Sequence, residues 1–186
     1  MDFDSWAAEI HANNVAVGWW DNPDECIYQK MQLICTEIAE ATEGERKNMM
    51  DDHLPTRKMA EVELADALIR TLDLGGRLGL TYDLDAPWNT MCESDGSIGK
   101  QHLGINASTL SFAYEYSHWT FDGCDTSHLG LMPMSYGYSI LIKSIMQVAA
   151  NGGYDVESAM IEKLEYNKHR PDHKKENREA EEGKKF

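Results

Sequence analysis

Two segments of the chain carry apolar residues at intervals of three and four, with acidic pairs beside each apolar stripe. The first stripe is Ile27, Met31, Ile34, Ile38 and Ala41, and the second is Ala65, Leu68, Ile69 and Leu72. This spacing is typical of amphipathic helices that bury one face. No segment alternates apolar and polar residues as a half-buried strand would. We therefore expect an all-α fold, a bundle of four to six helices.

The 186 residues suit a single domain, 1–186, with enough length to bury a core. Expected helices run over about 4–17 with Asp4 as N-cap, from Pro23 to about 44, from Pro55 to a Gly75-Gly76 stop, over 135–150, and from Asp155 as N-cap to Pro171. Between about Asp83 and Pro133 the periodicity fades, apart from a short helix expected over 107–119. Such a long connection indicates an insertion, a lid or an oligomer contact. The charged tail, 172–186, suits a flexible end or one that orders over a ligand.

The composition limits the partners. With 32 acidic and 17 basic residues the net charge is −15, which argues against nucleic-acid or anionic membrane surfaces. The N-terminus has no basic leader, and no run of about 18 apolar residues occurs. We therefore expect no membrane span and a cytoplasmic location. The four cysteines show no C-x-x-C spacing, so reduced thiols are favoured over a disulfide framework.

The acidic pairs are Glu37-x-x-Glu40 and Glu63-x-x-Asp66. Residues three apart share one helix face, so each pair presents two carboxylates together. Mg²⁺ and Mn²⁺ prefer such hard oxygen ligands and complete their shells with water and substrate phosphates. For a single pair a solvated helix face is the more common explanation. Two pairs beside apolar stripes favour a metal site. Asp73 offers either a further ligand or a salt bridge to a neighbouring arginine, Arg70 or Arg77.

A later segment carries Lys163, Asn167 and Arg170 at spacings of four and three, so their side chains project from one helix face. Lys and Arg can bind phosphate oxygens, and the amide can meet a sugar hydroxyl or a base edge. A basic helix end that complements its own dipole is the alternative. Near the end of the first helix, Asn14 and Trp20 are candidates for contacts to a base. Their alternatives are a helix cap for the asparagine and a core position for the tryptophan.

The segments LICTEIAEATEGER, MAEVELADALIRTLDL and MIEKLEYNKHRPDHK, in this order, resemble the MazG-like branch of the all-α nucleoside triphosphate pyrophosphohydrolases. The small bacteriophage-encoded members are the most similar in character. The signature of that superfamily is E-x-x-E on one helix, E-x-x-D on the next, and a later helix with spaced Lys, Asn and Arg. The resemblance covers the N-terminal half and the last helix, and leaves 83–133 unmatched.

The resemblance implies hydrolysis of a (deoxy)nucleoside triphosphate to the monophosphate and pyrophosphate. Glu37, Glu40, Glu63 and Asp66 would hold Mg²⁺ or Mn²⁺, with Glu37 and Glu40 also catalytic. The substrate would contact Lys163, Asn167, Arg170, Trp20 and Asn14. Many members begin the first motif with two glutamates, whereas Thr36 precedes Glu37 here. The general base therefore stays open between Glu37 and activation of water by the metal alone.

The resemblance to phage MazZ-type enzymes, which are associated with dGTP removal, gives a weak preference for a purine base such as that of dGTP. A pyrimidine-specific dUTP or dCTP pyrophosphatase is the alternative of the same chemistry. A non-catalytic helical module that binds a metal or a partner is the alternative of another class. The resemblance also implies a homodimer or homotetramer, and the host cytoplasm if the protein is phage-encoded.

Two other motifs are weaker evidence for a metal site. Glu115-x-x-His118 has the spacing of a di-iron ligand pair, but that architecture normally needs a second Glu-x-x-His, and the chain has none. A zinc site can be drawn from two cysteines and two histidines: Cys92, His102, Cys124 and His128. Because Cys124-x-x-x-His128 has no matching partner pair, scattered loop residues explain these four better.

Overall fold

The computed structural model describes residues 1–21, 27–122, 134–170 and 177. In these residues the regular structure is six α-helices and one 3-10 turn, and no sheet forms. The elements are α1 (Phe3–Ala16), α2 (Ile27–Lys47), α3 (Met59–Leu78), η1 (Thr90–Cys92), α4 (Ile98–Asp122), α5 (Met134–Gly152) and α6 (Val156–His169). The predicted all-α class is confirmed. No described helix is both long and apolar enough to cross a membrane.

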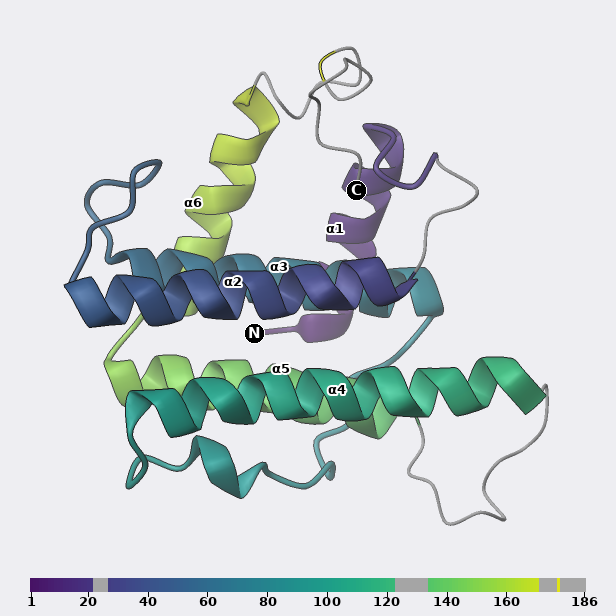
Figure 1. The fold of residues 1–186 in the computed structure, drawn as a ribbon. Helices are drawn as coiled ribbons and strands as arrows, with labels where there is room; N and C mark the ends of the chain where they lie inside the picture. The colour runs from purple at the N-terminus through teal and green to yellow at the C-terminus, as the bar shows by residue number, and fades with distance from the viewer. Residues whose placement is uncertain (22–26, 123–133, 171–176, 178–186) are drawn as a thin grey trace.

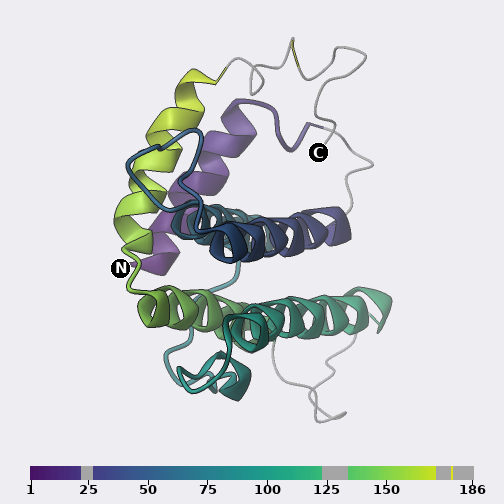
Figure 2. The same ribbon diagram turned by 60° about the vertical axis from the view of Figure 1, so that its left-hand side comes forward.

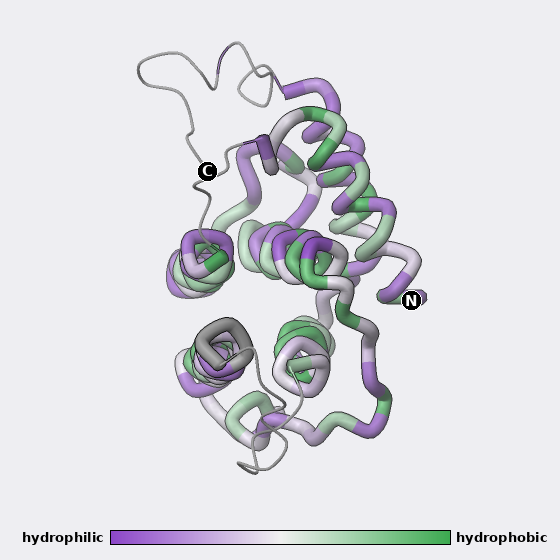
Figure 3. Tube along the Cα trace, turned by 90° about the vertical axis from the view of Figure 1, so that its right-hand side faces the viewer, coloured by the Kyte–Doolittle hydropathy of each residue, from purple (hydrophilic) through white to green (hydrophobic). Residues whose placement is uncertain are grey.

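Four of the helices form a ring around a shared apolar core. α2 packs on α3, α3 on α5, α5 on α4 and α4 on α2. Figure 3 shows these helices nearly end-on, with α2 above α4 and α3 above α5. Ile34, Leu68, Phe112 and Leu141 are fully buried, one from each helix. α1 and α6 both pack on α3, on the side of the α2–α3 layer away from α4 and α5 (Figures 1 and 2).

The starts of α1 and α6 are each capped by a side chain that accepts a backbone N–H group, whereas α3 has no such cap. The prediction of Asp4 as the first N-cap is wrong: the cap is Asp2, which accepts from the amide of Ser5 at 3.2 Å. Asp4 instead accepts from the amide of Tyr82 at 2.8 Å. At α6 the predicted cap is confirmed, because Asp155 accepts from the amide of Ser158 at 3.1 Å. Pro23, the expected start of α2, lies outside the described residues.

The bounds of α3 differ from prediction at both ends. The helix starts at Met59 rather than Pro55 and continues through Gly75 and Gly76 to Leu78. It ends where Gly79 takes a left-handed conformation, with φ +65°, which only glycine adopts readily. A Cβ at Gly75 would overlap the Tyr138 ring of α5. The glycine is therefore a close-packing position between two helices, not a helix stop.

The expectation of a loop-rich insertion over 83–133 is wrong for its central part. α4 is 25 residues long and extends well beyond the expected 107–119. Its inward face mixes apolar Ile105 and Phe112 with small polar residues such as Ser108, whose hydroxyl lies 2.9 Å from that of Ser144 on α5. Because a polar contact replaces part of the apolar stripe, hydrophobic periodicity underestimates the length of this helix. The stretch 123–133 lies outside the described residues.

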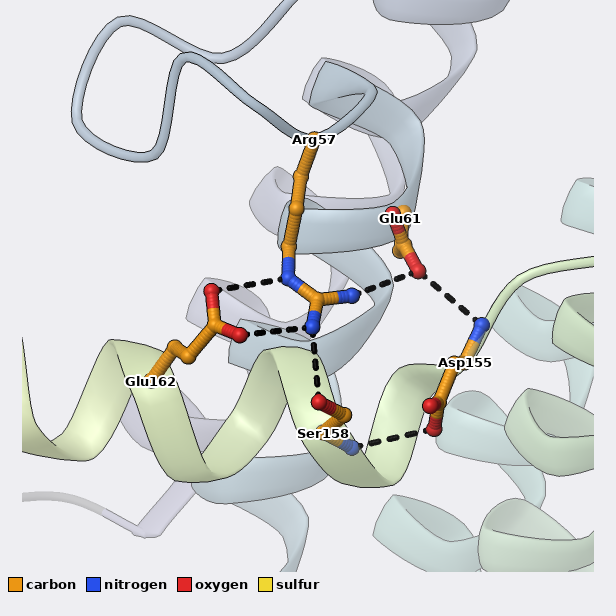
Figure 4. A network of polar contacts seen from close by, with 5 residues as sticks. All are labelled: Arg57, Glu61, Asp155, Ser158 and Glu162. Carbon is orange, nitrogen blue, oxygen red and sulfur yellow. Dashed lines mark hydrogen bonds and ion pairs between the residues drawn. The ribbon is translucent and has the colours of Figure 1, made fainter.

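A partly buried guanidinium, that of Arg57, attaches α6 to the start of α3 (Figure 4). Arg57 donates to both carboxylate oxygens of Glu162 at 2.8 and 3.0 Å and to the Ser158 hydroxyl at 2.7 Å. It also donates to Glu61 at 2.8 Å, and Glu61 accepts from the amide of Asp155 at 2.9 Å. Glu61 thus has a role in joining the helices.

Replacing Gly75 with alanine tests the α3–α5 contact. We expect Gly75→Ala to lower the free energy of unfolding by about 1–3 kcal/mol, because the added methyl group must displace Tyr138. The matched control is Gly99→Ala on α4, where a Cβ meets nothing within 4 Å. That variant should be unchanged or up to about 1 kcal/mol more stable. Urea unfolding measures both, and equal stabilities would contradict the packing role of Gly75.

Candidate functional site

Three carboxylates from α2 and α3 meet at the contact between these helices. Glu37 comes from α2, and Glu63 and Asp66 from consecutive turns of α3. One carboxylate oxygen of each lies within 4.8 Å of the others. Glu37 and Glu63 are each only 6% exposed, and Asp66 is partly exposed. The structure therefore brings together three of the four residues predicted as metal ligands.

Two cations accompany the three carboxylates. The Lys163 ammonium of α6 lies 2.8 Å from Asp66 and is buried, at 2% exposure of the residue. Arg70, one turn beyond Asp66 on α3, contacts Glu37 Oε1 through both Nε and Nη2. Asp66 is therefore paired with Lys163, and Glu37 with Arg70. Among the described ion pairs, none involves Glu63.

The crowding of negative charge shifts the protonation of the cluster. Burial, together with the charges of Asp66 and Glu37, raises the pKa of Glu63 to about 9. Burial also raises the pKa of Asp66, although the nearby Lys163 opposes that shift. Burial acts to lower the pKa of Lys163, but the carboxylates of Asp66, Glu63 and Asp51 outweigh it and raise the pKa overall. At neutral pH the cluster thus favours a proton on Glu63.

The donor set suits a hard divalent cation. All three groups offer carboxylate oxygens, which Mg²⁺ and Mn²⁺ prefer, and no histidine or cysteine belongs to the described cluster. A cation there would relieve the same repulsion that raises the pKa of Glu63. The residues therefore fit the expected metal, and Glu37, Glu63 and Asp66 are the side chains that would hold it.

Glu40, the fourth predicted ligand, lies at the edge of the cluster. It is exposed and is not one of the three groups with oxygens within 4.8 Å of one another. Partial burial and the charges of Glu37 and Asp66 nevertheless raise its pKa. Glu40 is therefore close enough to sense the cluster electrostatically while facing solvent.

A cavity of about 120 Å³ opens beside Asp66, between α1, α3 and α6. Asn167 and Arg170, both predicted to contact substrate, line it together with Asn14. Its remaining walls are Trp19, Lys30, Ile69, Arg70, Asp73 and Leu74. A larger groove of about 890 Å³ between α1 and α6 shares Asn14, Trp19, Ile69, Asn167 and Arg170 with the cavity. Lys163 does not line the cavity but contacts Asp66, which does.

Asp73 has neither of the two roles considered from the sequence. Its carboxylate lies 2.8 Å from His11 Nδ1 and accepts from Asn14 Nδ2, also at 2.8 Å. The indole N–H of Trp20 donates to both of its oxygens, at 3.1 and 3.2 Å. Asp73 therefore joins α3 to α1 and to the turn after α1.

The two tryptophans of that turn differ in their surroundings. Trp19 lines both the cavity and the groove, whereas Trp20 lines neither. The Trp20 ring is contacted by Lys30, 4.9 Å from its centroid, and by Arg77 at 5.3 Å. The structure thus places Trp19 at the cavity and Trp20 in a cation-lined position behind it.

Sequence reasoning chose Trp20 of the tryptophan pair, whereas Trp19 is the one that lines the cavity. It missed two cations of the cavity, Lys30 and Arg70. Lys30 had a visible signal, because it lies seven residues before Glu37 and therefore on the same face of α2. Arg70 shares a helix face with Glu63 and Asp66, but its contact with Glu37 joins residues 33 positions apart. No local pattern reveals such a pair.

The other sequence motifs do not form metal sites in the described residues. Glu115 is buried against Gly137 of α5, whereas the His118 Nδ1 lies 2.9 Å from the backbone oxygen of Tyr114. Cys92 Sγ contacts the Gln101 carbonyl, and His102 Nδ1 lies 2.7 Å from the Thr42 hydroxyl. Cys124 and His128 lie outside the described residues.

No family model, curated protein or solved structure matches this chain in the comparisons made.

Removing the Lys163 ammonium tests the buried ion pair. In EDTA, we expect Lys163→Met to lower the free energy of unfolding by about 3 kcal/mol, because Asp66 loses its cation. Adding Asp66→Asn should recover part of that loss, giving a coupling of about 1–3 kcal/mol in a double-mutant cycle. Lys168→Met, which removes an exposed lysine from the same helix, is the control and should change little. A zero coupling would contradict the pairing.

The buried Glu115 predicts a pH dependence of stability. Burial raises the pKa of Glu115 from 4.5 to about 7, although the Gly137 amide and the Ser111 side chain oppose the shift. Its contribution to stability is therefore complete below about pH 4.5 and is lost as the pH rises through 7. We expect the wild type to lose on the order of 2 kcal/mol relative to Glu115→Gln between pH 5 and 8. Urea unfolding at both pH values measures this difference.

The exposed Glu157 of α6 supplies the control, because Glu157→Gln should follow the wild type at every pH. Parallel curves for wild type and Glu115→Gln would show that the buried carboxylate does not titrate in this range.

Proposed function

We propose that the protein is a metal-dependent nucleoside triphosphate pyrophosphohydrolase of the MazG-like kind, releasing a nucleoside monophosphate and pyrophosphate. The observation that carries the proposal is the carboxylate cluster of Glu37, Glu63 and Asp66, within 4.8 Å of one another beside a cavity. Carboxylates at this spacing suit Mg²⁺ or Mn²⁺, and Asp66 also lines the cavity.

Substrate phosphates would be bound by the cationic residues that line the cavity. Arg170, Arg70 and Lys30 line it and can donate charge-assisted hydrogen bonds to phosphate oxygens. A divalent cation held by the cluster would neutralise phosphate charge and lower the pKa of a nearby water. Lys163 has a positioning role: its buried ammonium holds Asp66 in place.

Glu40 is the best-placed group to accept the proton of the attacking water. It is exposed, adjoins the cluster and has a raised pKa, which makes its carboxylate a stronger base than an ordinary glutamate. Glu37 is less suited, because Arg70 engages one of its oxygens through two nitrogens. Glu37 would instead serve as a ligand.

A non-catalytic helical module is the second candidate. The pairing of Glu37 with Arg70 and of Asp66 with Lys163 favours it, because a cluster neutralised by its own cations can be purely structural. The two candidates differ in turnover. Only the enzyme should release pyrophosphate, whereas a binding module should show metal-dependent stabilisation alone.

Self-association is part of the proposal. α4 carries exposed Leu103, Leu110 and Tyr114 at spacings of seven and four, which places them along one face of the helix. An exposed apolar stripe of this kind suits a contact with a second copy in a homodimer or homotetramer.

The deciding experiment measures pyrophosphate and orthophosphate release from the common NTPs and dNTPs with Mg²⁺ or Mn²⁺, with EDTA as a control. We expect metal-dependent pyrophosphate release by the wild type. Glu40→Gln and Asp66→Asn should each lose on the order of a hundredfold or more in kcat/KM with the fold retained, because base and ligand are removed. Circular dichroism checks the fold.

Glu43→Gln is the matched control on α2. Glu43 pairs with Arg46 and Lys47 at the surface, and its loss should leave the rate unchanged. A two- or three-fold effect of Asp66→Asn would count against the metal assignment. The absence of pyrophosphate from every triphosphate would favour the binding module.

A further inference from the structure

The two cations that contact the carboxylate cluster differ in their exposure to solvent. The Lys163 side chain, paired with Asp66, is 3% exposed, whereas the Arg70 side chain, paired with Glu37, is 38% exposed. Separating Lys163 from Asp66 would leave a buried charge without its partner, which is strongly unfavourable. Arg70 is open to solvent and also lines the cavity. Arg70 is therefore the cation that can change its partner.

Arg70 uses a carboxylate that a divalent cation would also need. Its Nε and Nη2 both contact Oε1 of Glu37. One oxygen of Glu37 lies within 4.8 Å of oxygens of Glu63 and Asp66, and the residue is only 6% exposed. A cation held by the three carboxylates would draw on the negative charge that the guanidinium already neutralises. Arg70 and a divalent cation are therefore competitors for Glu37.

The charges of the cluster also favour the release of Arg70. The three carboxylates carry at most three negative charges, which a divalent cation and Lys163 together balance. Arg70 would then add a positive charge close to the divalent cation, and the repulsion is strong where water has little access. Glu40, a further carboxylate nearby, is exposed, so water screens its charge.

The cavity offers the released guanidinium a new partner. Arg170 and Lys30 line the same cavity as Arg70, so a phosphate group bound there lies among positive charges. A guanidinium pairs with phosphate through two parallel hydrogen bonds, as it does with a carboxylate. Arg70 can therefore exchange Glu37 for a phosphate group without becoming unpaired.

We propose that Arg70 competes with the divalent cation for Glu37 and, once released, binds a phosphate group of the ligand. The guanidinium thus couples the two binding events, because the cation frees it and the phosphate keeps it away from Glu37. Each ligand strengthens the binding of the other through this residue. The inference rests on the proposed function for the identity of the ligands as a divalent cation and a polyphosphate.

Calorimetric titration of Arg70→Met separates competition from simple support of the fold. We expect this variant to bind Mg²⁺ on the order of tenfold more tightly than the wild type, because no guanidinium has to leave Glu37. At saturating Mg²⁺ it should bind inorganic pyrophosphate on the order of tenfold more weakly, because a phosphate contact is lost. General damage to the structure would weaken both. Equal or weaker binding of Mg²⁺ would overturn the inference.

Lys30→Met is the matched control for the loss of a positive charge. Lys30 lines the same cavity, but its ammonium lies 4.9 Å from the centroid of the Trp20 ring. We expect weaker binding of pyrophosphate and an Mg²⁺ affinity within about twofold of the wild type. A gain in Mg²⁺ affinity as large as that of Arg70→Met would show a general effect of charge and contradict competition for Glu37.

The Nε–Hε signal of Arg70 in NMR spectra of the wild type reports the exchange directly. The chain has six arginines, so the signals can be resolved, and Arg70 donates this N–H to Glu37. We expect Mg²⁺ to move the signal toward that of solvent-exposed arginines, and added pyrophosphate to restore a hydrogen-bonded shift. Arg57, which donates through Nε to Glu162 at 3.0 Å, is the internal control. An unmoved Arg70 signal, with the Glu63 amide shifted by Mg²⁺, would overturn the inference even if Arg70→Met fails to fold.

The outcomes separate failure of this inference from failure of the proposed function. Pyrophosphate release from a triphosphate, with Arg70 still on Glu37 at saturating Mg²⁺, would leave the enzyme intact and refute the competition. Exchange of Arg70 from Glu37 to pyrophosphate, without cleavage of any triphosphate, would support the competition and refute the catalytic proposal. The absence of Mg²⁺ binding would refute both.

Discussion

The arrangement of the site depends on the buried ion pair between Lys163 of α6 and Asp66 of α3. Lys163 and Asn167 share one face of α6, so contact of the first with α3 turns the second toward the cavity, and Arg170 follows directly after the helix. At the start of α6, Arg57 makes a second attachment to Ser158 and Glu162. Both attachments hold α6 in one orientation relative to α3, and this orientation places Asn167 at the cavity without a ligand. Such preorganisation lowers the cost of ordering side chains on binding.

The carboxylate cluster lowers the stability of the folded chain, whereas this packing raises it. Apolar residues in place of Glu37, Glu63 and Asp66 would favour folding more, since burial and the neighbouring charges raise the pKa of Glu63 and burial raises that of Asp66. A strained group of this kind persists where function requires it. Glu61 and Asp51 show the contrast within the same region: the first is satisfied by Arg57 and a backbone amide, and the second by the amides of His53 and Leu54. Those carboxylates stabilise the fold, whereas the cluster needs a proton or a cation.

What the sequence predicted, and what it did not, follows the range of each interaction. The i, i+3 pairs and the Asp155 cap are local, and the helices that carry them were located from spacing alone. α4 was underestimated because Ser108 and Ser144 replace part of its apolar stripe with a polar contact. The role of Asp73 was missed because its partners lie 53 to 62 positions away in the sequence. Local periodicity gives the helices, but only their packing determines which polar side chains meet.

The acidic residues along one face of α3 show how surroundings give one residue type different roles. Asp66 faces an ammonium, Glu63 faces other carboxylates, and Asp73 faces His11 and the N–H groups of Asn14 and Trp20. Because hydrogen bonds already engage both oxygens of Asp73, a cation is favoured near Glu63 and Asp66, two turns earlier on the helix. Under the proposed function, this difference between the two ends of the acidic face would orient the ligand. The phosphates would then lie toward the carboxylate cluster, and the rest of the ligand toward the groove between α1 and α6.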